Sequence, residues 1–227
     1  MTAFQRARND EQREQRRAAI LVTAASMLDE MGVAALSLNE LSRRVGLAKS
    51  NVMRYFESRE AVLLELLHAE ATDFLEQVVG PVSGRVDSSL PPRQRIDAIA
   101  AELTHEYVRH PILCELLSAQ AAVLERNVST PVAIRYKRES LASIDSFAEA
   151  MRSLLPELGT AGAARAVWLI TVLVGALWSH GHPTPAVEAA FEQDPSLERA
   201  RAPFAQMLEQ SIVTVLVGQL EQGRGEV

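Results

Sequence analysis

Several things are scarce in this sequence, and each shortage excludes a class of protein. There is one cysteine, Cys114, so no disulfide can form within the chain, and a reducing compartment is indicated. Aromatic residues make up 5% of the chain, which disfavours a pocket built to stack large flat ligands. The charged stretch MTAFQRARNDEQREQRR lacks the apolar core of a secretory signal, and the longest uncharged apolar run, 166–178, has 13 residues where a membrane helix needs roughly 20. We therefore expect a soluble, cytoplasmic protein without a membrane partner.

Catalytic and metal-binding motifs are also missing. There is no G-x-S-x-G, no Walker A motif and no G-x-G-x-x-G after a strand. His105 and His110 in HEYVRH are five residues apart, which places them about 140° apart around a helix, too far to share a metal. His180 and His182 have no nearby cysteine or carboxylate, and Cys114 lies in an apolar context typical of a packed residue. We expect no enzyme activity, no cofactor and no metal.

Charge is distributed unevenly along the chain. The formal net charge is -6, yet residues 1–60 carry 10 Lys/Arg against 8 Asp/Glu, and residues 61–227 carry 13 against 21. A mildly basic head on an acidic body indicates a polyanionic partner for the head alone.

Hydrophobic residues recur at helical spacing along nearly the whole chain, and the alternation typical of strands is hard to find. The sequence therefore predicts an all-α fold of about nine helices, with a Gly- and Pro-rich loop at about 80–92. The predicted helices span about 10–31, 38–45, 47–56, 58–79, 91–109, 111–127, 129–155, 160–180 and 195–221. Gly32 is expected to end the first of them.

Two short predicted helices form a helix-turn-helix pattern. Ser37 and Glu40 form a capping box before one helix, Gly46 ends it, and a second short helix follows after a tight turn. In such domains the second helix enters the major groove and reads bases with its N-terminal residues. We therefore predict that residues 1–58 are a DNA-binding domain and that residues 59–227 form a separate helical domain. The alternative is that 37–60 are merely short helices with a solvated charged face.

The chemistry of the third predicted helix suits DNA. Lys49, Ser50 and Asn51 lie at its start, and asparagine can make a bidentate contact to adenine. Met53 is placed to contact a thymine methyl group, while Val52 and Phe56, four apart, would face inward. Contacts to phosphate are predicted for Arg54, Tyr55, Arg59 and the start of the helix after Ser37, with further contacts from Arg6, Arg8 and Arg13 in the basic N-terminal arm.

The stretch LSLNELSRRVGLAKSNVMRYFESREAVLLELL resembles the DNA-binding signature of the TetR-type transcriptional regulators. The resemblance covers about residues 15–65 and rests on Gly46, the Tyr55–Phe56 pair and the basic residue at 59. It implies that Tyr55, Lys49 and Arg59 contact phosphates, and that Ser50, Asn51 and Asn39 lie near bases. Many members carry tyrosine where this chain has Met53.

The resemblance also implies a homodimer on a palindromic operator and a C-terminal domain that binds a small effector. It assigns dimerisation to the helices at about 160–180 and 200–221, which two-fold pairing would join into a four-helix interface. The effector pocket is expected among the fourth to eighth helices. Its candidate lining residues are polar or aromatic: His68, Thr72, His105, Tyr107, Gln120, Trp168 and Thr171.

The resulting hypothesis is a ligand-responsive regulator of transcription, in particular a repressor released from double-stranded operator DNA by an unknown small molecule. Two alternatives from other classes stay open at this point. One is a helical interaction module whose head binds an acidic protein. The other is a helical-bundle enzyme with an attached DNA-binding head.

Overall fold

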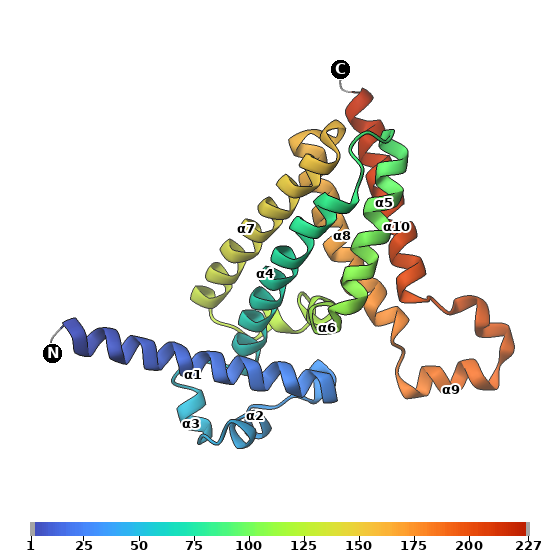
Figure 1. The fold of residues 1–227 in the computed structure, drawn as a ribbon. Helices are drawn as coiled ribbons and strands as arrows, with labels where there is room; N and C mark the ends of the chain where they lie inside the picture. Colours follow the sequence, from blue (N-terminus) through green and yellow to red (C-terminus); the bar gives the residue numbers. More distant parts are fainter. Residues whose placement is uncertain (1–2, 226–227) are drawn as a thin grey trace. The chain divides into compact units, whose positions relative to one another are not determined.

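The computed structural model describes residues 3–225 (Figure 1), and within them the chain is helical with no strand. The prediction of an all-α fold is confirmed. The α-helices are α1 (Ala3–Glu30), α2 (Leu38–Val45), α3 (Lys49–Val52), α4 (Arg59–Arg85), α5 (Pro92–Arg109), α6 (Pro111–Ala119), α7 (Thr130–Leu154), α8 (Gly159–Gly181), α9 (Pro185–Gln193) and α10 (Phe204–Gly225). Short 3₁₀ turns are η1 (Val33–Ala35), η2 (Leu124–Arg126), η3 (Pro156–Leu158) and η4 (Pro195–Ala200).

The helix boundaries differ from prediction where tertiary contacts decide them. The predicted loop at 80–92 is wrong for its first residues, because α4 continues to Arg85. Its apolar stripe repeats every four residues through Phe74, Val78, Val82 and Val86, all at most 7% exposed, and burial of that stripe outweighs the local Gly and Pro. α9 was not predicted, and α10 begins at Phe204 because 195–200 forms η4. α6 stops at Ala119 instead of continuing to 127.

Contacts divide the chain into two compact units. The first unit comprises the residues up to Ala69 together with Ala119–Lys137. The second unit comprises Glu70–Ser118 and the residues from Arg138 onward. The boundaries fall inside α4, α7 and the last turn of α6, so α4 and α7 each contribute several turns to both units.

The core of the first unit joins α1 to the short helices. Ile20, Ala24 and Met27 of α1 are fully buried at three- and four-residue spacing, as are Leu41 of α2 and Val52 of α3. α2 packs against both α1 and α3, which lie beside it in Figure 1. Among residues 11–19 of α1 no apolar side chain is buried, so the contribution of α1 to the apolar core begins at Ile20.

The second unit is built on contacts between α10 and its neighbours α8 and α5. Leu208, Ile212 and Leu216 of α10 are fully buried and form an apolar stripe inside the protomer. Gly175 lets α8 approach the end of α6 closely, since a Cβ there would lie 2.7 Å from the Leu117 carbonyl oxygen.

The segment Pro156–Gly181 is the one helical stretch in the described residues that is long and apolar enough to cross a membrane, with a mean hydropathy of 1.7. Core helices of soluble proteins share that length and composition, and α8 packs against α10.

Candidate nucleic-acid interface

The start of α2 is fixed by its cap. The Ser37 Oγ accepts a hydrogen bond from the Glu40 backbone N–H at 3.2 Å, as predicted. The Glu40 carboxylate instead accepts from the Nε of Arg43 and the Nε of Arg44, both at 2.9 Å, and these arginines lower the pKa of Glu40 to about 2. Gly46 has φ 73° and ends the helix in the left-handed conformation.

The glycine predicted to end α1 behaves differently. α1 ends at Glu30, and Gly32 has φ -64° and ψ 164°, which is extended backbone open to any residue. The prediction that Gly32 serves as a left-handed C-terminal glycine is therefore wrong. Gly32 lies just before η1, and Leu36, which is 1% exposed, lies just after it.

α3 is shorter than predicted and ends in a turn. Its α-helical part is Lys49–Val52, after which i to i+3 hydrogen bonds from Arg54 N and Tyr55 N tighten the chain. Val52 and Phe56 are 0% and 3% exposed, so both face inward as predicted. The helix ends early because the chain turns into α4, whose first turn is capped by a 3.0 Å hydrogen bond from Ala61 N to the Ser58 Oγ.

The nine residues predicted to contact DNA lie between the N-cap of α2 and the first residue of α4. Seven of them are exposed: Ser37, Asn39, Lys49, Ser50, Asn51, Met53 and Arg54. Tyr55 and Arg59 are half-buried. The Nη1 of Arg59 donates to the Leu36 carbonyl at 3.2 Å, so this arginine also fixes the connection before α2.

Sequence reasoning missed Arg17, which holds the turn after α3 in place. Its Nη1 donates to the Tyr55 carbonyl at 2.8 Å, and its guanidinium lies 4.6 Å from the centre of the Phe56 ring. Its Nη2 is paired with Glu65 of α4, which also accepts from Arg135 at 3.3 Å. Arg17 lies one residue after Arg16 in a basic run, and nothing in the sequence distinguishes the half-buried Arg17 from its exposed neighbours.

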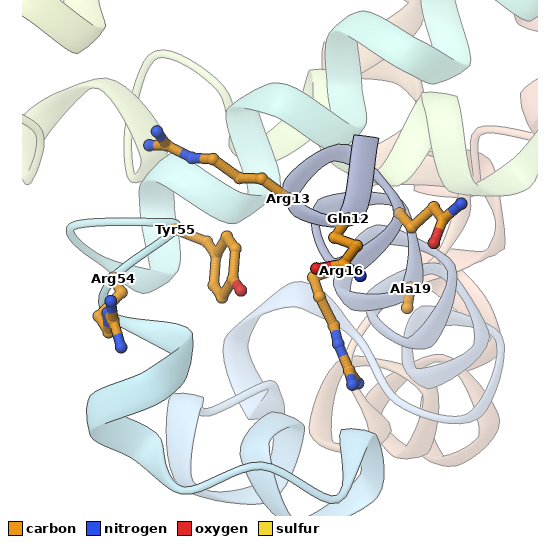
Figure 2. A pocket seen from close by; sticks show the side chains of 7 residues that line it. Gln12, Arg13, Arg16, Ala19, Arg54 and Tyr55 are labelled. Atoms are coloured by element: carbon orange, nitrogen blue, oxygen red, sulfur yellow. The ribbon is translucent and has the colours of Figure 1, made fainter. Parts of the chain in front are cut away.

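A concavity of about 950 Å³ lies between α1 and the turn after α3. In Figure 2 the Tyr55 ring points from that turn toward α1. The lining residues are Gln12, Arg13, Gln15, Arg16, Ala19, Arg54 and Tyr55. They include three arginines and no carboxylate, so the concavity is basic in a chain whose net charge is -6.

The seven candidate effector-lining residues are distributed over both units. His68 and Gln120 belong to the first unit and the other five to the second. His105 and Trp168 are exposed, and the hydroxyl of Thr171 donates to the Val167 carbonyl of its own helix at 2.9 Å. Tyr107 is the most buried of the set, at 2% exposed, and its ring stacks on Phe74 with centroids 4.4 Å apart.

The histidines and the cysteine occupy ordinary structural positions. No group of three or more His, Cys, Asp or Glu side chains suited to a metal is found among the described residues. The His182 ring stacks on Trp178 with centroids 3.7 Å apart. Cys114 is fully buried, and burial raises the pKa of its thiol to about 12, so it stays protonated at neutral pH.

The fold and this surface define a helix-turn-helix DNA-binding protein. Residues 20–66 match the family model of bacterial regulatory proteins of the tetR family, and residues 69–223 match that of the tetracyclin repressor-like C-terminal domain. The chain therefore belongs to the tetR family and is a DNA-binding transcriptional regulator.

Solved structures are similar to this chain at low sequence identity. A TetR transcriptional regulator from Rhodococcus sp. RHA1 is 15% identical with a TM-score of 0.54, and the match covers 91% of this chain and 96% of that one. A second regulator from Rhodococcus sp. Rha1 is 17% identical (TM-score 0.48, 92% and 96% covered). The fatty acid degradation regulator FadR from Bacillus halodurans is 10% identical (TM-score 0.47, 86% and 97% covered). No curated protein matches the sequence.

Replacing Arg17 by methionine should destabilise the protein, because the Tyr55 carbonyl and the Glu65 carboxylate lose their shared, 14% exposed partner. We expect the free energy of unfolding, measured in urea, to fall by about 2 kcal/mol. Arg135→Met removes the half-exposed second partner of Glu65 and should cost less than about 1 kcal/mol. Equal losses for the two variants would contradict the central role of Arg17.

Proposed function

We propose that the protein is a repressor that binds a palindromic operator as a homodimer and releases it when a small molecule binds the C-terminal domain. The observation that carries this proposal is the exposed row Lys49, Ser50 and Asn51 at the start of α3, anchored by the buried Val52 and Phe56. In this proposal residues 1–58 form the DNA-binding domain and residues 59–227 the effector and dimerisation domain. It assigns no catalytic step, and it places the protein in the cytoplasm with no membrane partner.

The proposed contacts fall into two kinds. Ser50, Asn51 and Asn39 read base edges, and the exposed Met53 lies against a thymine methyl group. Phosphates are held by the remaining predicted residues: Ser37, Lys49, Arg54, Tyr55 and Arg59. Phosphate contacts position a domain without reading sequence, whereas base contacts give specificity.

Selection from random duplex DNA tests these roles. The wild type should enrich a palindrome with half-sites about one helical turn apart. Tyr55→Ala should weaken binding to all sequences alike, and Asn51→Ala should blur one base position at a cost of about 1–3 kcal/mol. Arg93→Gln on α5 serves as a control for a lost surface charge. Failure of the wild type to enrich any sequence would overturn the repressor proposal.

Homodimerisation is proposed through α8. This helix leaves Trp168 and Val172, one turn apart, 55% and 51% exposed within the protomer, and 166–178 contains no charged residue. The resemblance assigned dimerisation to the last helix as well, but the apolar stripe of α10 faces the protomer interior. We therefore propose that the exposed side of α8 is the principal contact. A second copy related by a two-fold axis would cover it with the same surface.

Trp168→Glu should convert the dimer to a monomer, because two-fold symmetry places a carboxylate in the interface twice. The molar mass from light scattering after gel filtration should fall by half, and affinity for the palindrome should fall while a single half-site is bound as before. Leu141→Glu is the matched control, since Leu141 is 59% exposed on α7 of the same unit. A dimeric Trp168→Glu protein would exclude this interface.

Effector binding is proposed to reach the DNA-binding residues through α4 and α7, the two long helices that contribute residues to both units. The effector would contact some of the seven candidates named above, and coupling between sites is typically worth about 1–3 kcal/mol. α7 has a direct link to the recognition region. The Glu57 carboxylate, two residues after Tyr55, accepts from Ser129 N at 2.6 Å and Ser129 Oγ at 2.7 Å, just before the first turn of α7.

The Glu57–Ser129 link should depend on pH. The Ser129 donors lower the pKa of Glu57 below its ordinary 4.5, so the link contributes stability above that value and loses it as the pH falls through the lowered pKa. Hydrogen exchange of the first α7 amides, about 129–133, should therefore accelerate in Glu57→Ala at neutral pH and in the wild type only at acidic pH. Glu149→Gln, which alters a pair on the exposed side of α7, should leave that exchange unchanged. Equal protection in Glu57→Ala would remove the proposed link.

A further inference from the structure

We propose that the concavity between α1 and the turn after α3 binds phosphate groups of the operator backbone, so that α1 is a second DNA-binding element beside α3. The inference rests on the proposed function and extends it to residues that lie before the match to the tetR family model, which begins at residue 20. The ligand class is a phosphodiester, recognised by charge and not by base sequence.

The residues of α1 that line the concavity all lie on one face of the helix. Successive residues of a helix are turned by about 100°, so positions 12, 13, 15, 16 and 19 share one side. All five line the concavity, and they are two glutamines, two arginines and an alanine. Glu14 interrupts the same run but falls on the opposite side of the helix, and Glu11 borders the face beside Gln15 without lining the concavity.

The arginines that line the concavity lack the ion pair that five other arginines of the first unit form. Arg17, Arg43, Arg44, Arg59 and Arg135 each form an ion pair with a glutamate. Among the described residues, no carboxylate is paired with Arg13, Arg16 or Arg54, and all three are exposed. Because no internal carboxylate offsets the charge of these three guanidinium groups, they can attract an external anion.

The folding of the unit does not explain this face of α1. No residue from 11 to 19 is buried, and the core contribution of α1 begins at Ile20. Apart from Ala19 the lining is polar, which excludes an apolar ligand. Guanidinium groups, amide N–H groups and the Tyr55 hydroxyl are all donors suited to phosphate oxygens.

The position of the concavity favours DNA over a free phosphorylated molecule. Arg54 and Tyr55 directly follow the exposed row of α3, so the concavity adjoins the residues proposed to enter the major groove. A DNA backbone that borders the groove can continue from α3 onto α1. The phosphates bound by Arg13 and Arg16 would then lie outside the bases read by α3.

The test compares Arg13→Gln/Arg16→Gln with the wild type on the selected palindrome. Both arginines are exposed, so circular dichroism and thermal unfolding should be unchanged. Each phosphate contact contributes about 0.9 to the slope of log K against log salt, and a dimer carries both arginines twice. From 50 to 200 mM salt we expect the slope to become shallower by about 2–4, with roughly tenfold or greater weakening at the lower salt and an unchanged base preference.

The matched control is Arg93→Gln, which removes an exposed arginine of α5 that is paired with Asp97. It should keep the wild-type slope. Ethylation interference should show, in addition, that the double variant no longer depends on phosphates outside the palindrome while the wild type does. A double variant with the wild-type slope, or with an altered base preference, would overturn the proposal.

Two further experiments distinguish failure of the proposed phosphate site from failure of the repressor proposal. Inorganic pyrophosphate, titrated at constant ionic strength, should not displace the operator; displacement would assign the concavity to a free phosphorylated ligand and overturn the backbone assignment. If the wild type enriches no palindrome, the salt slope is compared on random duplex DNA. A slope that is shallower in the double variant would then support the phosphate site even though the repressor proposal had failed, and identical slopes would overturn both.

Discussion

The DNA-binding surface depends on one partly buried cluster of charge. Arg17 of α1 donates to the backbone of Tyr55, lies over Phe56 and is paired with Glu65 of α4, which Arg135 of α7 also contacts. Three segments, α1, the turn after α3 and α4, therefore meet at one guanidinium, and Glu65 connects α7 to them. A planar, permanently charged group with several donors can join a carbonyl, a ring and a carboxylate at once, which lysine could not do.

This cluster helps to stabilise the short recognition helix α3. A helix of four residues has too few internal hydrogen bonds to be stable alone, so α3 relies on buried Val52 and Phe56 and on the fixed Tyr55 carbonyl. The exposed residues at its start are consequently set by packing beneath them and not by helix propensity. Such a rigid base suits a protein that must present polar side chains to base edges at a defined position.

The arginines of the first unit that are discussed above form two groups. Paired and partly buried arginines such as Arg17 and Arg59 fix the backbone, whereas Arg13, Arg16 and Arg54 remain exposed around the concavity. An acidic protein can bind a polyanion in this way, because charge that is already neutralised internally contributes little to the field outside. The excess of carboxylates lies after residue 60, in the remainder of the chain.

Sequence alone determined the helical class, the Ser37 cap, the left-handed Gly46, the inward Val52 and Phe56 and the resemblance to a family, because each depends on local geometry or periodicity. Tertiary structure decided the rest. Buried Val82 and Val86 carry α4 through a stretch that reads as a loop, and α8 rather than α10 has the exposed apolar face. Arg17 is held by contacts inside the protein, whereas its neighbour Arg16 is exposed and lines the concavity. The contacts that distinguish them involve residues about 40 or more positions away, which no local sequence pattern encodes.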